Sequence, residues 1–379
     1  MIVYSSKPKQ VLKLLPLMAL AAMLLLSPAV SIAAAREALQ LFATVVLPSL
    51  FPFIVCSQLL LKMRIDQALG FLFAPMAKFL DLPKSVGGAF ITSVIAGYPS
   101  GALSVTTLYQ RGVLRHNLQT AIALCSTAGP MFVIGMLGTS LLGSTQAGWM
   151  ILLSHYNGLF MAAFATNIIM KAFKWERKSN APITALKQKP PETLDDIITR
   201  SCMVMLKIGG FIVIFRVLGD ILFTLPVLRP LLDASHIAVL QPLLRGMLEM
   251  ADGCAHAATL PFVPASLVMC FIISFGGICI YFQSLSMLSG LPIRKGVFLL
   301  SKVLHGIFSA FSLWVMLLIN PLALPTSGQT TSGIVPILSL APTIRWGAYA
   351  FIAAVLLFLI LRQCPRIWLR FWRTMSKFR

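Results

Sequence analysis

Several ionisable residues lie inside apolar stretches of the chain, where burying a charge is expensive and therefore suggests a function. These residues are Lys207, Arg216, Asp220, Arg245, Glu249, Asp252, Lys302 and His305. Two pairs, Arg216–Asp220 and Arg245–Glu249, have the four-residue spacing at which opposite charges neutralise each other on one helix face. Lys207 has no acid nearby in sequence, so it is our leading candidate to contact an anion; the alternative is that its ammonium snorkels to the helix end.

Glu249 has three open interpretations, because it lies in an apolar segment between Gly246 and Gly253. It could pair with Arg245, carry a proton, or contact a solute. Placing a charged carboxyl group at membrane depth without a partner costs free energy. Each interpretation therefore gives Glu249 either a partner or a proton.

Three short motifs interrupt apolar segments that would otherwise form continuous helices. They are Gly97-Tyr98-Pro99-Ser100-Gly101, Ser126-Thr127-Ala128-Gly129-Pro130 and Phe275-Gly276-Gly277. A broken helix exposes backbone N–H and C=O groups that lipid cannot satisfy, so such breaks face protein or a wet cavity. Half-helix N-termini and nearby hydroxyl groups would suit an anion there. The alternative is that these glycines and prolines only kink the helices and allow close packing.

Motifs for enzymatic chemistry are absent from the sequence. The five histidines, residues 116, 155, 236, 256 and 305, show no metal-binding spacing. Neither a nucleophile elbow nor a phosphate-binding loop of the nucleotide-hydrolysing type is present. We therefore expect no enzyme, no cofactor and no metal site.

The composition excludes a soluble globule. Of 379 residues, 58% are hydrophobic and 11% are charged, and the mean hydropathy is +0.87, whereas soluble domains carry about 25% charged residues. The net charge of +20 comes from basic runs between apolar segments, as in cytoplasmic loops of membrane proteins. The sequence predicts an all-α polytopic membrane protein with about 8–10 hydrophobic segments and broken or re-entrant helices, in a lipid bilayer and without nucleic acid as a partner.

The apolar segments divide into two related halves. The expected units are a retained N-terminal membrane helix (1–36), a first half (37–173), a cytoplasmic linker (174–196), a second half (197–361) and a basic cytoplasmic tail (362–379). The alternative for the first unit is a signal peptide cleaved after the small residues Ala33-Ala34-Ala35. The basic loops of the first half all fall on the cytoplasmic side only if residues 86–109 enter the membrane and return as a hairpin with its tip at 97–101. The segment 237–258 is interpreted as a further span. Charge alone favours parallel repeats, although inverted repeats stay open.

The order of the glycine-rich motifs resembles the sporulation integral membrane proteins of the YlbJ type, in the nucleoside-recognition or gate-domain superfamily. The motifs are residues 88–90, 95–102, 125–132, 208–213, 246–249 and 273–277, the last followed by Gln283. They cover roughly residues 36–320. The run of motifs is specific, whereas each one alone is short.

The resemblance implies a stage-V sporulation protein that moves dipicolinic acid across the outer forespore membrane, with a fold related to nucleoside carriers. A small planar dianion is consistent with the residues, which by themselves indicate only a carrier for an anion. A non-transporting scaffold of the spore envelope, a nucleoside-type solute carrier and assembly as a homo-oligomer all stay open. The candidate binding residues are Gly97, Tyr98, Pro99, Ser100, Gly101, Ser126, Thr127, Gly129, Pro130, Lys207, Glu249, Phe275, Gly276, Gly277 and Gln283. We expect the 97–101 and 275–277 breaks to face each other near mid-membrane, because two half-sites must converge on one solute.

Overall fold

The computed structural model describes residues 18, 21–63, 73–175, 193–225 and 238–319. These residues form helices joined by short connections, and no strand occurs among them. Within this part of the chain, four helical stretches are long and apolar enough to cross a membrane: Pro28–Val46, Leu194–Thr224, Phe262–Met287 and Lys295–Ile319. The all-α polytopic prediction is confirmed. The expected span at 344–361, the tail and most of the 174–196 linker lie outside the described residues.

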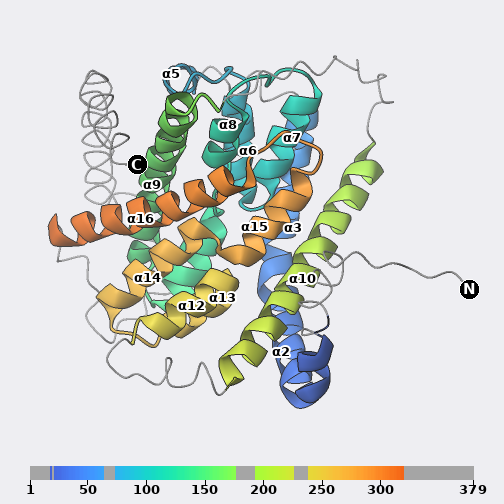
Figure 1. Ribbon diagram of the computed structural model, residues 1–379, viewed down its shortest axis with the longest axis vertical. Helices are drawn as coiled ribbons and strands as arrows, with labels where there is room; N and C mark the ends of the chain where they lie inside the picture. Colours follow the sequence, from blue (N-terminus) through green and yellow to red (C-terminus); the bar gives the residue numbers. More distant parts are fainter. Residues whose placement is uncertain (1–17, 19–20, 64–72, 176–192, 226–237, 320–379) are drawn as a thin grey trace, which may run out of the picture.

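The first half begins with one long run of helix and continues through a hairpin and a broken helix to a second long helix (Figure 1). Its elements are α2 (Pro28–Leu41), η1 (Phe42–Val46), α3 (Leu47–Lys62), α5 (Ala74–Phe79), α6 (Val86–Ala96), α7 (Ser100–Gln110), α8 (Leu118–Leu124), η2 (Met131–Leu141) and α9 (Thr145–Ala172).

The second half follows the same order of long helix, hairpin, broken helix and long helix. Its elements are α10 (Leu194–Thr224), α12 (Leu240–Leu248), α13 (Met250–Ala257), α14 (Phe262–Phe275), α15 (Gly277–Met287) and α16 (Lys295–Ile319). In Figure 1 the hairpin α6–α7 occupies the upper part of the molecule and the hairpin α12–α13 the lower part.

The hairpin α6–α7 was expected from charge parity and is confirmed. Thr92 Oγ1 lies 3.0 Å from Ser104 Oγ, so residues far from the turn on each helix are neighbours. Gly97, whose φ of +69° is positive, ends α6, and α7 begins at Ser100. Pairing Thr92 and Ser104 across this tip requires the two helices to run antiparallel.

The segment expected as a span at 237–258 is instead a second hairpin, which corrects that interpretation. Glu249 adopts an extended backbone (φ −135°, ψ 121°) that ends α12 and starts α13. Gly253 then lies so close to Gly246 that a Cβ on it would collide with the Gly246 backbone. Small residues at both positions allow this close antiparallel approach.

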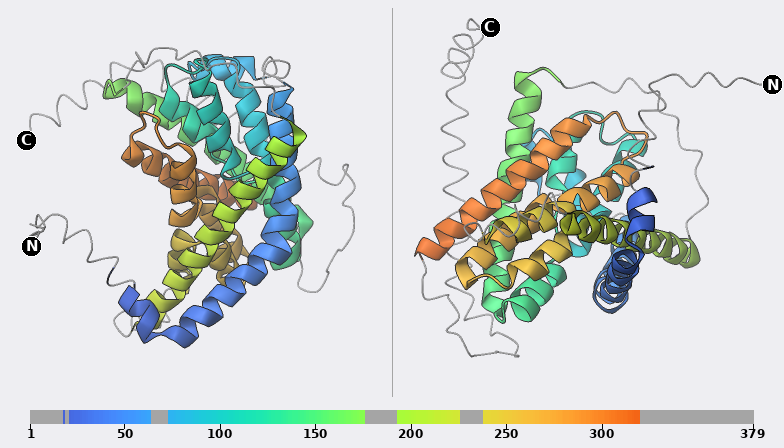
Figure 2. Two further views of the ribbon diagram at one scale, coloured as in Figure 1. Left: turned by 90° about the vertical axis from the view of Figure 1, so that its right-hand side faces the viewer. Right: turned by 60° about the horizontal axis from the view of Figure 1, so that its bottom comes forward.

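Corresponding elements of the two halves run in opposite directions. Along α9 and α16, Asn157 bonds Ser312 while the earlier Ser154 bonds the later Met316, so these helices are antiparallel. Helices α2 and α10 are antiparallel too: Glu37 contacts Arg216, whereas Ala34 packs with the later Ile221. Figure 2 shows α10 packed against α2 and α3 at one side of the molecule. The matching order and opposite direction define inverted repeats.

This arrangement needs no violation of the charge rule, contrary to the argument from charge alone. Residues 118–142 and 297–319 both start at the basic end and so run in the same direction, but the helix of the first half that corresponds to α16 is α9. The exposed basic residues Lys84, Arg111, Arg115, Arg294 and Lys295 cluster at the end where α7 stops and α16 starts. We call this end the basic side of the molecule; the connection of residues 143–144 lies at the other end.

The boundary expected at residue 36 falls inside a helix. The helical run restarts at Pro28, after Ser27 with non-helical φ and ψ of −130° and 56°, and continues through η1 and α3 to Lys62. Proline is well placed at the first position of a helix because its missing N–H is not needed there. The π-helical turn Phe42–Val46 comes just before Pro48, where the regular hydrogen-bond pattern cannot continue.

Candidate functional site

The three breaks meet in the centre of the molecule. Gly97 packs against Gly129 so tightly that a Cβ on Gly97 would collide with the backbone of Gly129. Tyr98 Oη lies 3.2 Å from the carbonyl oxygen of Ile273 and 3.3 Å from that of Ser274, directly before the third break. The expectation that 97–101 and 275–277 face each other is confirmed.

The buried ammonium of Lys302 lies where these breaks meet. Its Nζ donates to Tyr98 Oη at 2.5 Å, to the carbonyl oxygen of Ser126 at 3.1 Å and to His305 Nδ1 at 3.4 Å. Lys302 is 2% exposed, and its Nζ lies 4.5 Å from the centre of the Tyr98 ring. All three donors of the ammonium therefore have partners, and these partners are neutral.

Lys302 makes no ion pair with a carboxylate of the described residues. Burying an ion without a counter-ion costs several kcal/mol after relaxation. The carbonyl oxygens at the ends of α8 and α14 offset part of this cost, because helix C-termini carry partial negative charge. The centre of the molecule thus holds one buried amine whose polar partners are all neutral.

Two histidines extend this centre, and their partners fix which ring nitrogen carries the proton. His155 Nε2 accepts from the Ala128 N–H at 3.1 Å, so Nδ1 bears the proton and donates to Ser274 Oγ at 2.7 Å. Thr127 Oγ1 lies 2.8 Å from the same Nε2. His305 Nε2 donates to the carbonyl of His155 at 3.0 Å, which leaves Nδ1 to accept from Lys302.

The remaining residues of the first two breaks give the hairpin tip its shape. Ser100 Oγ donates to the carbonyl of Gly97 at 2.6 Å. A Cβ on Gly101 would collide with the carbonyl of Cys125, so α7 crosses the end of α8 at closest approach. Pro99 is buried, while Pro130 is half-buried and precedes η2. These groups position the backbone and leave the polar contacts to their neighbours.

The third break connects the two hairpin tips. Gly276 and Gly277 have φ of +84° and +72°, which separates α14 from α15 after the buried Phe275. A Cβ on Gly276 would touch the Tyr98 ring, and one on Gly277 would meet Leu248 O and Met250 N, on either side of Glu249. The tips of α6–α7 and α12–α13 therefore approach the same broken helix from opposite directions.

Glu249 does not pair with Arg245, which corrects the first of its three interpretations. Its carboxylate is 4% exposed and accepts from the N–H groups of Ala251 at 3.1 Å and Asp252 at 2.7 Å. A carboxylate at the N-cap satisfies backbone donors that would otherwise lack partners and interacts favourably with the helix dipole. Glu249 is therefore the N-cap of α13.

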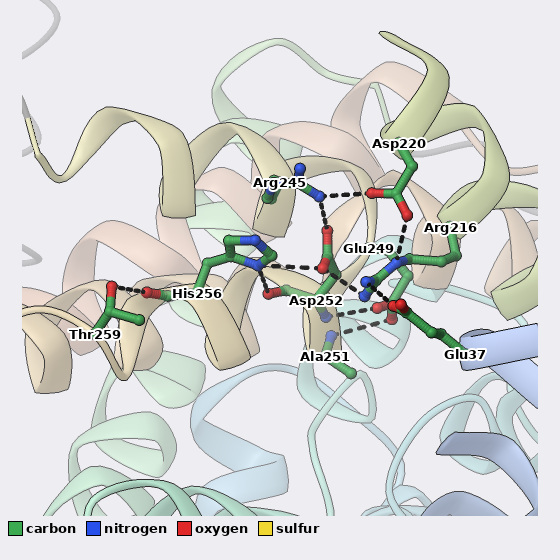
Figure 3. Close-up of polar contacts among 9 residues, drawn as sticks. All are labelled: Glu37, Arg216, Asp220, Arg245, Glu249, Ala251, Asp252, His256 and Thr259. Carbon is green, nitrogen blue, oxygen red and sulfur yellow. Dashed lines mark hydrogen bonds and ion pairs between the residues drawn. The ribbon is translucent and has the colours of Figure 1, made fainter. Parts of the chain in front are cut away.

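Arg245 instead belongs to an ion-pair network that connects α2, α10 and α12–α13 (Figure 3). Asp252 contacts Arg216 at 2.5 Å and Arg245 at 3.0 Å, and Asp220 contacts the same two arginines at 3.0 and 2.8 Å. The predicted Arg216–Asp220 pair is confirmed. Glu37 contacts Arg216 at 2.6 Å from α2.

His256 extends the network toward solvent at the far end of α13. Its Nδ1 lies 3.2 Å from Asp252 Oδ1, and its side chain is 34% exposed. The hydrogen bond to Asp252 raises the pKa of His256 above its ordinary value, and partial burial opposes this rise. This histidine lies outside the four spanning helices.

Two candidate residues lie apart from the central contacts. Lys207 is exposed on α10, so it does not join the cluster around Lys302. Gln283, 1% exposed on α15, contacts Cys279 Sγ at 3.2 Å through Nε2, and its Oε1 lacks a partner among the described residues. The lysine at the meeting point of the breaks is Lys302, one of the ionisable residues noted above but not a leading candidate.

Sequence reasoning also passed over His155, which it tested only for metal-ligand spacing. The available signal was its position in the middle of the apolar segment 149–172, without a charged neighbour. A histidine there needs polar partners from other segments. Those partners lie in the second break, 126–130, and at Ser274, directly before the third break.

Two inverted halves with opposed hairpins, broken helices and a buried polar centre define this chain as an all-α, multi-pass integral membrane protein. Its sequence is similar to the sporulation integral membrane protein YlbJ of Bacillus subtilis (strain 168), at 26% identity over 328 residues that cover 78% of this chain and 79% of that protein. The resemblance to YlbJ-type proteins is thus confirmed, and it supports a role as a membrane protein in sporulation. No family model matches the chain, and no solved structure matches it.

Proposed function

We propose that this chain is a carrier, not an enzyme, which moves a small organic anion across the outer forespore membrane during sporulation, with dipicolinic acid as the substrate. The similarity to a sporulation integral membrane protein supports the setting. The order of hairpin, broken helix and long helix in two inverted halves supports the carrier class, because secondary transporters commonly have this construction.

The observation that carries the proposal is the ammonium of Lys302. It lies at the meeting point of three helix breaks, with neutral partners and no carboxylate among the described residues. An anion that reaches this point would supply the missing opposite charge, and charge-assisted hydrogen bonds to a carboxylate are among the stronger ones in proteins. Dipicolinate is a planar dianion with two carboxylates, so it matches the sign of the site.

The centre in this structure is closed, and this observation favours the scaffold alternative. Gly97 and Gly129 are packed backbone to backbone, and Lys302 is 2% exposed. In a carrier, the hairpin tips must separate to admit the solute. A nucleoside-type carrier would require the same opening, but a neutral solute would leave the charge of Lys302 uncompensated.

Uptake into vesicles that contain only this protein distinguishes these functions. We expect accumulation of labelled dipicolinate in proteoliposomes, and little accumulation of labelled uridine. Lys302→Met should reduce dipicolinate uptake to the level of empty vesicles, because it removes the positive charge while retaining a long side chain. Lys207→Met, on the exposed face of α10, is the matched control and should transport normally.

Three results would count against the proposal. Absence of dipicolinate uptake by folded wild-type protein would favour the scaffold. Preference for uridine would favour the nucleoside-type carrier. Equal loss of uptake in both lysine variants would show that transport does not depend specifically on Lys302.

The basic side faces the cytoplasm in this proposal, since lysine and arginine resist translocation. The linker 174–196 and the tail 362–379 would be on the same side. Single cysteines introduced into either segment should resist a membrane-impermeant thiol reagent in intact cells. Modification from outside would reverse the proposed orientation.

A further inference from the structure

A cavity of about 210 Å³ lies on the basic side, where the two halves of the molecule meet. The end of α9, the residues before α8 and the loop before α16 surround it. Gln119 Nε2 lies 3.4 Å from the carbonyl of Arg294 and so connects the halves at this point. The cavity is remote from the Lys302 cluster, and none of its lining residues belongs to that cluster.

The lining carries two arginines and no acid. Arg115 Nε donates to the carbonyl of Gly112 at 3.0 Å, which orients its guanidinium. Arg294 stacks over the ring of Trp175, with 4.9 Å between guanidinium carbon and ring centre. Neither arginine forms an ion pair with a described residue. Guanidinium groups held in this way are suited to bind phosphate oxygens.

Two buried amide side chains in the same lining indicate what else the ligand must carry. Asn117 is 7% exposed and Gln119 is 5% exposed. Asn117 Nδ2 donates to the carbonyl of Asp81 at 2.7 Å, while Asn117 Oδ1 and Gln119 Oε1 have no partner among the described residues. Buried oxygens without partners call for a donor. A matching ligand therefore combines an oxyanion with hydroxyl groups.

We propose that this cavity binds the headgroup of an anionic phospholipid of the phosphatidylglycerol type. Arg115 and Arg294 hold the phosphate, and the glycerol hydroxyls donate to Asn117 Oδ1 and Gln119 Oε1 once these side chains rotate toward the cavity, since both oxygens are enclosed in this structure. The inference is independent of the proposed transport, because it concerns a separate site. Soluble glycerol phosphate has the same chemistry and is the second possible source of the ligand.

The surroundings favour the lipid as the source. Apolar residues, namely Leu118, Met170, Pro292 and Ile293, form the other part of the wall. The volume is below the roughly 300–1,000 Å³ of pockets that enclose a whole drug-sized ligand, so it suits a headgroup whose chains remain outside. Arg294 directly precedes the spanning helix α16, and tryptophan and basic residues are types that gather at the membrane interface.

Titration of the full-length protein in detergent with short-chain phosphatidylglycerol tests the proposal. We expect saturable binding at least tenfold tighter than that of phosphatidylcholine with the same chains. The double variant Arg115→Gln, Arg294→Gln should weaken phosphatidylglycerol binding at least tenfold. Arg111→Gln, an exposed arginine outside the cavity lining, is the control for general charge and should bind normally.

Several outcomes decide the matter. Glycerol phosphate that binds as tightly as the lipid and is weakened by the same double variant would support the site and assign it to a soluble ligand. Equal binding of both lipids, or unchanged binding in the double variant, would overturn the proposal. Equal weakening by Arg111→Gln would do the same. Because the two arginines are exposed at the rim, the variants should keep the circular dichroism spectrum of the wild type.

Discussion

Removing the Asp252 carboxylate should destabilise the protein through the network that joins α12–α13 to α2 and α10. In Asp252→Asn the shape of the side chain is retained and the charge is lost. Asp252 is 4% exposed, and its partners Arg216 and Arg245 have side chains that are 18% and 12% exposed. The contacts are therefore largely shielded from solvent, and removing one partner of a shielded ion pair is strongly destabilising.

The structure sets the expected magnitude. Asp252 accepts one hydrogen bond from each arginine, and a hydrogen bond to a charged group contributes about 1.5–3 kcal/mol. Asp220 still contacts both arginines in the variant, so neither cation is left alone. We therefore expect a loss of about 2–3 kcal/mol, less than the 3–5 kcal/mol typical of a buried ion that loses its only partner.

Glu37→Gln is the matched control, because Glu37 contacts the same Arg216 from a side chain that is 62% exposed. An exposed ion pair contributes about 1 kcal/mol or less. Unfolding by sodium dodecyl sulfate in mixed micelles, followed by circular dichroism, gives the free energy of unfolding for each variant. If Asp252→Asn is no more destabilised than Glu37→Gln, burial does not set the strength of this network and our reasoning is wrong.

Three further predictions concern single positions. Gly97→Ala should lower the free energy of unfolding by about 2–4 kcal/mol, because the positive φ and the close backbone contact both oppose a Cβ. Gly210→Ala, in open space on α10, should not lower it. Equal melting temperatures of the two variants would contradict this prediction. The contact with Asp252 raises the pKa of His256, so protonated His256 stabilises the protein fully below the ordinary histidine pKa, and this stabilisation is lost as pH rises through the raised pKa. In unfolding titrations across pH 5–9, His256→Gln should remove this decline in the free energy of unfolding. An unchanged pH profile in the variant would show that the contact with Asp252 does not contribute to stability. His155→Leu should cost about 3 kcal/mol by leaving buried polar groups without partners, and an unaltered free energy of unfolding would show that water replaces the ring.

The sequence predicted the features that depend on local chemistry. Composition predicted the membrane class, and Gly97 and Pro99 predicted the hairpin tip, because these residues interrupt a helix wherever they occur. The first and third breaks were expected to face each other, because backbone groups exposed by a helix break need polar partners inside the protein. Each of these inferences uses residues adjacent in the chain and the general properties of a bilayer.

The sequence did not predict contacts that depend on direction in space. Arg245 and Glu249 have the correct spacing for a pair, but the chain turns at Glu249 and no continuous helix face joins them. The glycines at 246 and 253 were the available signal for this turn. Lys207 and Lys302 look alike in sequence, and only the packing of α16 against α9 buries the second.

The short hairpins have an electrical consequence. Helices α6 and α7 have 11 residues each, and α12 and α13 have 9 and 8. At 1.5 Å per residue these lengths are about 12–17 Å, roughly half of a 30 Å hydrocarbon core. The layer between the two tips is therefore thin, and the amine of Lys302, which is charged in the function proposed above, lies within it. Moving one elementary charge across the full membrane potential changes its energy by about 2.3 kcal/mol per 100 mV. A separation of the tips that moved this fixed charge would make the conformational equilibrium of the protein sensitive to voltage.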